Sequence, residues 1–169
     1  MKRNAVALLG LLALFASVSV GAQTKMSGTL KCNKADPSYK LDAGDRPEHG
    51  YSLEKSACTW TQPADVGADK TKDGYSISVT ETTATRGMLH GTHVTTMQSG
   101  DKTFVAFHDA YPMKDGKPGD STGHWSYTGG TGKLKGLKGK GTYKATPSDD
   151  GTVTVVVEGE YELPAPAAK

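Results

Sequence analysis

Histidines are the first candidates for chemistry, because an imidazole can bind metals and transfer protons near neutral pH. The chain has five of them: His49, His90, His93, His108 and His124. Only His90 and His93 lie close together, and residues three apart on a strand point to opposite faces. The HExxH pattern of zinc hydrolases and the GxSxG nucleophile elbow do not occur. We therefore expect no metal site, no cofactor and no catalytic residue that a motif would mark.

Two further polar residues could act inside a folded domain. Glu81 shares strand alternation with the apolar residues of segment 75–79, and His108 shares it with those of segment 104–106. If these faces are interior, Glu81 and His108 point into the domain, where a carboxylate needs a partner or takes a raised pKa. The alternative is that both lie at a wet rim.

Three large aromatic residues are candidates for a cavity wall. Trp60, Trp125 and Tyr127 could line a binding cavity, or they could simply fill the core.

The most distinctive segment is Trp125–Lys144, WSYTGGTGKLKGLKGKGTYK. It fails the phosphate-loop pattern, because neither Gly-Lys pair is followed by Ser or Thr. Its glycines suit tight bends and close strand approach in a curled sheet. Its lysines, which include Lys133, Lys135, Lys138 and Lys140, form a solvated face or a contact for an anionic glycan or lipid. Acidic residues follow at 149–162 and would neutralise much of that charge.

The only two cysteines are Cys32 and Cys58. Their spacing is far from CxxC, and no nearby histidine pair completes a metal site. In an oxidising compartment such a pair favours a disulfide over two free thiols.

The N-terminal segment indicates that compartment. A short basic start, an uncharged run from Ala5 to Val20 and small residues ending at Ala22 predict a signal peptide over 1–22. The run is too short to cross a bilayer, so we expect no transmembrane segment in the mature form and a periplasmic or secreted bacterial product. Removing Lys2 and Arg3 leaves 18 basic against 18 acidic residues, which argues against a nucleic-acid partner.

The mature chain alternates β-favouring residues between Gly, Pro, Asp and Asn, with almost no helical periodicity. Strands are predicted at 25–33, 50–60, 74–85, 88–98, 102–108, 122–128, 138–146 and 152–163. The last has Val153, Val155 and Val157 on one face and glutamates on the other. The polar connections 34–49 and 61–73 are expected to be surface loops that could cover a barrel mouth. The prediction is an all-β protein with one antiparallel barrel of about eight strands over 23–163, and a disordered tail over 164–169.

The run Tyr127–Leu134, followed by Gly136, Gly139 and a strand, resembles the GGTGxF turn of allene oxide cyclase and dirigent barrels. It is also similar to small exported bacterial proteins that share this ending. Leu134 stands where those families usually have an aromatic residue. The resemblance covers about 20 residues closely, and it implies an eight-stranded barrel whose interior could hold a small apolar ligand. A lipocalin-like barrel is the alternative architecture.

Three functional hypotheses follow. The first is non-enzymatic binding of a small apolar or amphipathic ligand. The second is an enzyme of cyclase or dirigent type that steers a reactive intermediate within a pocket, where cavity shape could catalyse without a sequence motif. The third is binding to an anionic glycan or lipid surface through the lysines of Lys133–Lys144. No interface is evident in the sequence, and assembly into an oligomer stays open.

Overall fold

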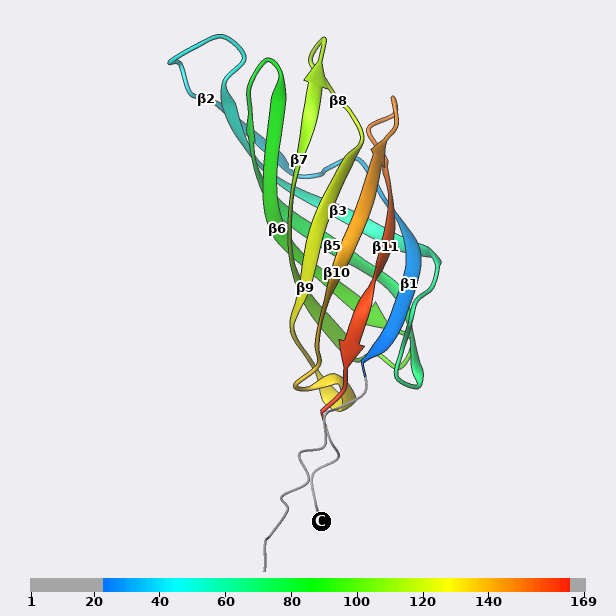
Figure 1. Ribbon diagram of the computed structural model, residues 1–169. Coiled ribbons are helices and arrows are strands. Elements are labelled where there is room, and N and C mark those ends of the chain that lie inside the picture. The colour runs from blue at the N-terminus through cyan, green and yellow to red at the C-terminus, as the bar shows by residue number, and fades with distance from the viewer. Residues whose placement is uncertain (1–22, 165–169) are drawn as a thin grey trace, which may run out of the picture.

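The computed structural model describes residues 23–164. The predicted signal peptide and all but the first residue of the predicted tail lie outside the described residues. Eight long strands form one closed antiparallel barrel (Figure 1). They are β1 (Thr24–Cys32), β3 (Gly50–Gln62), β5 (Asp69–Thr82), β6 (Arg86–Met97), β7 (Lys102–Lys114), β9 (Ser121–Gly130), β10 (Lys138–Pro147) and β11 (Val153–Glu162).

The barrel closes because the first and last strands pair. Strand β1 bonds to β11 along one edge and to β3 along the other, while the remaining strands pair with their neighbours in chain order. The predicted fold class, an all-β antiparallel barrel of about eight strands, is therefore confirmed. The largest extensions beyond the predicted bounds are in β5, which begins at Asp69, and in β7, which continues to Lys114.

Short elements mark the two ends of the barrel (Figure 1). Strands β2 (Ser38–Asp42) and β8 (Lys117–Pro118) extend the wall at one end, which we call the mouth. Strand β4 (Asp65–Val66) and the 3-10 turn η1 (Gly132–Leu134) lie at the opposite end. The chain enters β1 and leaves β11 at that same opposite end, where Thr24 pairs with Tyr161.

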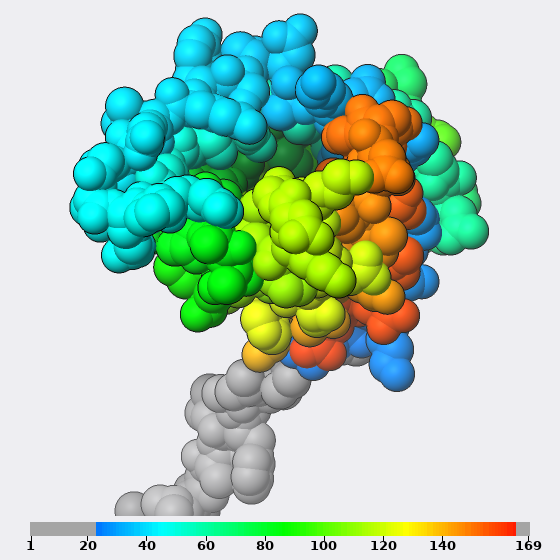
Figure 2. Space-filling view, turned by 90° about the horizontal axis from the view of Figure 1, so that it is seen from above, coloured from blue at the N-terminus to red at the C-terminus, as the bar shows by residue number. Residues whose placement is uncertain are grey.

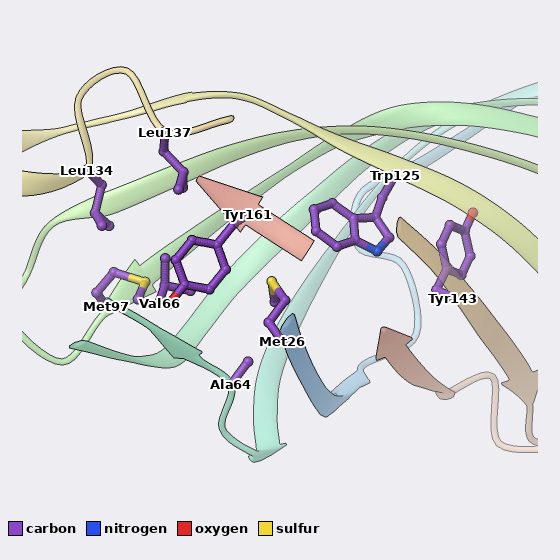
Figure 3. Packing of buried hydrophobic residues seen from close by; sticks show 9 residues of the cluster. All are labelled: Met26, Ala64, Val66, Met97, Trp125, Leu134, Leu137, Tyr143 and Tyr161. Carbon is purple, nitrogen blue, oxygen red and sulfur yellow. The ribbon is translucent and has the colours of Figure 1, made fainter. Parts of the chain in front are cut away.

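The end opposite the mouth is filled by side chains (Figure 3). Ala64 and Val66, from the connection predicted as a surface loop, are completely buried there. They pack with residues of η1, of β6 and of the last strand; the cluster comprises Met26, Ala64, Val66, Met97, Trp125, Leu134, Leu137, Tyr143 and Tyr161. This apolar cluster plugs one end of the barrel, so the connection 61–73 closes the plugged end, whereas the connection 34–49 borders the mouth.

Glycines make room for the largest interior side chain, the indole of Trp125. A Cβ at Gly141 would lie 2.7 Å from Trp125 Nε1, and one at Gly159 would lie 2.4 Å from Trp125 Cζ2. The indole N–H donates to the carbonyls of Thr142 and Glu158, at 3.2 and 3.1 Å. The glycines of the last two strands thus serve close packing of an aromatic ring, which is the structural role that the sequence suggested.

The predicted disulfide is confirmed. Cys32 and Cys58 are paired residues on β1 and β3, with their Cα atoms 4.0 Å apart and their sulfurs bonded. Both side chains face the interior and are buried.

Candidate binding cavity

An apolar cavity of about 110 Å³ lies in the barrel between the plug and the mouth. Its walls are mainly aromatic and aliphatic, with Trp60, Phe107, Trp125 and Tyr127 among them. An engineered apolar cavity of roughly 150 Å³ is known to hold benzene, so this space is of the size class that takes one small ring.

The cavity continues into a wider hollow at the mouth. This hollow has a volume of about 650 Å³ and shares Phe107, Tyr143 and Val155 with the cavity wall. Figure 2 looks onto this end and shows the hollow between the β2 region, the β7–β8 turn and the β10–β11 turn. The interior therefore changes from apolar near the plug to polar at the mouth, where Ser78, Thr80 and Asp109 line it.

His93, on β6, is the most buried titratable side chain of the cavity wall. It is 8% exposed, and its Nδ1 lies 2.8 Å from the hydroxyl oxygen of Ser76 on β5. Its other nitrogen, Nε2, is buried and has no hydrogen-bond partner. Burial lowers the pKa of His93 to about 4, because a charged imidazolium loses its hydration there. His93 is therefore a neutral polar group in an apolar wall.

Asp109, on β7, is the corresponding polar group at the base of the mouth. Its Oδ2 accepts hydrogen bonds from the hydroxyls of Ser121 and Tyr143, both at 2.8 Å. Its Oδ1 is buried and unpartnered. Burial, together with the negative charges of Glu54 and Asp109, raises the pKa of Tyr111 to about 12. The mouth is thus an electronegative environment.

The structure places three of the predicted site residues on the cavity and two away from it. Trp60, Trp125 and Tyr127 line the cavity. Glu81 and His108, candidate cavity residues if their strand faces are interior, instead lie on the outer face of the barrel, so that placement is corrected.

The physical reason for this correction is strand parity. On β5 the side chains of Ser76, Ser78 and Thr80 line the interior, while the apolar residues between them, Tyr75 to Val79, are 37–38% exposed. A bulge between Thr71 and Asp73 shifts the register of this strand. On β7 the interior positions are Val105, Phe107 and Asp109, so His108 points outward.

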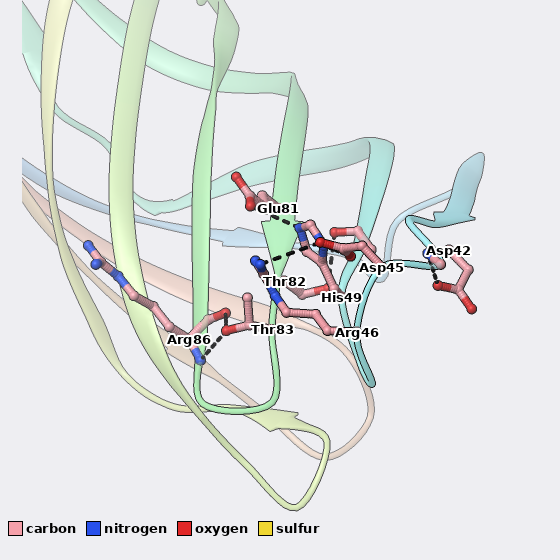
Figure 4. A network of polar contacts seen from close by, with 10 residues as sticks. Asp42, Asp45, Arg46, His49, Glu81, Thr82, Thr83 and Arg86 are labelled. Atoms are coloured by element: carbon pink, nitrogen blue, oxygen red, sulfur yellow. Dashed lines mark hydrogen bonds and ion pairs between the residues drawn. The ribbon is translucent and has the colours of Figure 1, made fainter.

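Glu81 belongs instead to a polar cluster beside the mouth (Figure 4). His49 lies between two carboxylates, with Asp45 at its Nδ1 and Glu81 Oε1 at 3.0 Å from its Nε2. The hydrogen bonds to Asp45 and Glu81 raise the pKa of His49, and the bond from His49 lowers the pKa of Asp45. A protonated ring has two N–H donors and satisfies both acceptors, and in that form His49 joins the connection 34–49 to strand β5.

The lysines proposed for anionic surfaces lie outside the barrel. Lys138 and Lys140, on β10, are exposed and pair in register with Glu162 and Glu160 of β11. Lys133 and Lys135 lie in and beside η1 and are also exposed. The basic strip of β10 therefore runs alongside an acidic one.

The sequence reasoning missed His93 and Asp109. The sequence marks His93 only as half of a close histidine pair, although it alternates with Thr95 and Met97, which are buried with it. Asp109 fell beyond the predicted end of its strand at His108. Within residues 23–164, no group of three His, Cys, Asp or Glu side chains could hold a metal ion. In the same part of the chain, no helix has the length and apolar character needed to span a membrane.

Comparison with known proteins supports the architecture. No protein family and no curated protein sequence matches the chain. Several solved structures resemble it in shape, and two of them are described here. The pterocarpan synthase dirigent protein GePTS1 superposes with a TM-score of 0.50 at 13% sequence identity, over 88% of this chain and 89% of that one. The fold is that of a dirigent-like barrel.

The second structure is a protein of unknown function from the DUF3224 family of Shewanella oneidensis MR-1. It superposes with a TM-score of 0.49 at 15% identity, over 86% of this chain and 100% of that one.

Proposed function

We propose that this protein binds a small apolar or amphipathic molecule inside its barrel and acts as a binding protein outside the cytoplasm. The observation that carries the proposal is an apolar cavity that is closed by the plug and reached from the mouth. Apolar concave sites with a few convergent polar groups are the usual form of a small-molecule site. The disulfide fits an oxidising compartment.

The proposal is tested with a matched pair of variants on one strand. Val155 lines both the cavity and the mouth, whereas its neighbour Val156 is 44% exposed on the outer face. Titration with 2-phenylethanol, followed by tryptophan fluorescence, should saturate in the wild type and in Val156→Phe. Val155→Phe, which fills the cavity, should abolish the saturable signal at unchanged thermal stability.

Native mass spectrometry of protein purified from its own cell envelope supplies the second readout. A retained small molecule that Val155→Phe loses and Val156→Phe keeps would support the proposal. No retained molecule, together with no saturable binding of 2-phenylethanol, would overturn it.

A cyclase- or dirigent-type enzyme is the second candidate. The dirigent protein that shares this fold is a pterocarpan synthase by name, and at 13% identity the likeness extends to the fold alone. The specific observation in its favour is that His93 places a neutral base on the wall of the apolar cavity and Asp109 places a carboxylate in the adjoining hollow at the mouth. The enzyme hypothesis would be favoured if the protein converted a bound molecule to a product and His93→Gln abolished this turnover without weakening binding.

The anionic-surface hypothesis stays a proposal with less support, because glutamates flank the lysines of β10. Binding to anionic vesicles that survives charge reversal of Lys133, Lys135, Lys138 and Lys140 would remove it.

A further inference from the structure

The charges of the barrel interior point to a more specific ligand. We propose that the preferred ligand is an organic cation, an inference that rests on the proposed function. Its small aromatic or aliphatic body lies in the cavity, and its ammonium group is held by Asp109 at the base of the mouth.

The first support is the distribution of charge. The charged side chains that line the cavity and the adjoining hollow are Glu54, Asp109, Lys117 and Asp149. Lys117 Nζ and Asp149 Oδ1 form an ion pair at 2.9 Å, with both side chains more than 70% exposed at the rim. Among the ion pairs of residues 23–164, none includes Glu54 or Asp109. The interior thus retains two carboxylates without a basic partner, and its histidine is neutral.

The second support is the state of the Asp109 carboxylate. One of its oxygens accepts two hydroxyl hydrogen bonds, while the other is buried without a donor. A buried charged acceptor without a partner is costly. An ammonium group brings three N–H donors and the opposite charge, so it compensates this carboxylate better than a neutral hydroxyl does.

The third support is the spacing between the apolar and the acidic parts. Phe107 lies on the cavity wall and Asp109 is the next inward residue on β7, about 7 Å further along the strand. A ring beside Phe107 with a two-carbon arm reaches that distance. Deeper in the cavity, His93 Nε2 and Trp60 Nε1 are also buried without partners, and His93 is nine-tenths buried.

The test compares three probes that share one body: phenethylamine, 2-phenylethanol and 3-phenylpropionate. At neutral pH they present a cation, a neutral hydroxyl and an anion. Isothermal titration of the wild type should give phenethylamine an affinity at least tenfold above that of 2-phenylethanol, with 3-phenylpropionate the weakest. Asp109→Asn should remove the preference for the amine and leave the alcohol nearly unaffected.

Asp149→Asn is the matched control, because it removes a carboxylate at the exposed rim that is already paired with Lys117. It should keep the preference. Equal affinities of the wild type for amine and alcohol would overturn the inference even if Asp109→Asn did not fold. That result would leave the proposed function standing, whereas binding of none of the three probes would count against both.

A separate observation concerns the outer wall. Of the ten exposed large hydrophobic side chains in residues 23–164, eight lie on the outer face of β2, β3, β5 and β6: Tyr39, Leu41, Tyr51, Leu53, Tyr75, Ile77, Val79 and Met88. Strand register makes them neighbours, since Tyr39 pairs with Leu53 and Leu53 with Val79. We call this set the outer apolar face.

The exposed area of this face indicates what binds to it. The exposed fractions run from 37% to 69%, which for large side chains of about 150–250 Å² each gives roughly 700 Å². That exceeds the largest apolar patch of a typical monomer, about 300–600 Å². It matches the roughly 800 Å² that each partner contributes to a standard interface. We infer that the outer apolar face binds a second copy of this chain, through a symmetric contact of the same patch on both copies.

Light scattering coupled to size exclusion tests this inference. The wild type should elute as a dimer, and Leu53→Lys combined with Ile77→Lys should elute as a monomer of unchanged thermal stability. Val156→Lys, at an exposed valine outside this face, should remain dimeric. A monomeric wild type at high protein concentration would overturn the inference. It would also be overturned if the wild type bound lipid vesicles, the double variant did not, and the two proteins had the same molecular mass in solution.

Discussion

Acid should destabilise this protein through His93 in particular. The unfolded chain has a histidine of ordinary pKa, about 6.5, whereas burial holds the folded pKa at about 4. Between these two values the unfolded state binds the proton and the folded state does not. Stability contributed by neutral His93 is therefore complete above pH 6.5, falls as the pH drops through this window, and reaches a plateau below about 4.

The magnitude follows from the two pKa values. Each pH unit within the window corresponds to about 1.4 kcal/mol, so lowering the pH from 7 to 5 should cost about 2 kcal/mol from this residue alone. His93→Gln removes the titration, and its free energy of unfolding should change by about 2 kcal/mol less than that of the wild type over the same interval.

The assay is urea denaturation at several pH values, with His90→Gln as the control. His90 lies on the same strand but is exposed on the outer wall, so its variant should retain the wild-type pH dependence. Titration of the His93 ring by NMR gives the folded pKa directly, even if the variant folds poorly. A ring that titrates near 6.5, or parallel stability curves for the wild type and His93→Gln, would refute this account of the cavity wall.

Three further outcomes are expected. Replacing Cys32 and Cys58 together with serine should lower the free energy of unfolding by about 3 kcal/mol, because the crosslink closes a loop of 26 residues; equal denaturation midpoints with and without reductant would contradict this. Gly159→Ala should cost about 1–3 kcal/mol by overpacking and change the near-ultraviolet circular dichroism of Trp125, whose ring a new Cβ would meet at 2.4 Å. His49→Gln should lower the thermal midpoint near about pH 6, where the raised pKa keeps this histidine charged between its two carboxylates. The deficit should shrink at a second, higher pH, because the charged hydrogen bonds are lost as the pH rises through the raised pKa. A deficit that is the same at both pH values would exclude the charged hydrogen bonds as its cause.

Much of the fold could be predicted from the sequence, because in most strands the hydrophobic alternation agrees with the barrel. Strand β11 is the clearest case: Val153, Val155 and Val157 face inward as their spacing requires. Strand β5 shows the limit. Its apolar residues face outward and its serines inward, since the mouth is lined by small polar groups. Alternation indicates which residues share a face of a strand, but not which face is interior, so it could not place Glu81.

Less of the site than of the fold could be predicted from the sequence. The sequence indicates that Trp60, Trp125 and Tyr127 are interior, because tryptophan and tyrosine are rarely left fully exposed, but it does not distinguish a cavity wall from a filled core. His93 and Asp109 were not predicted, because their importance depends on which strands become neighbours: Asp109 meets its partner Tyr143 only through the β7–β9–β10 pairing. Contacts of that kind leave no local pattern in the sequence.

The position of the two described chain ends has a practical consequence. Residues 23 and 164 both lie at the plugged end, and the strands between that end and the mouth are about ten residues or more, or roughly 30 Å when extended. A tether, tag or surface attached to either end therefore leaves the mouth facing away from the attachment. Immobilised protein should exchange small molecules with the solvent as freely as protein in solution does.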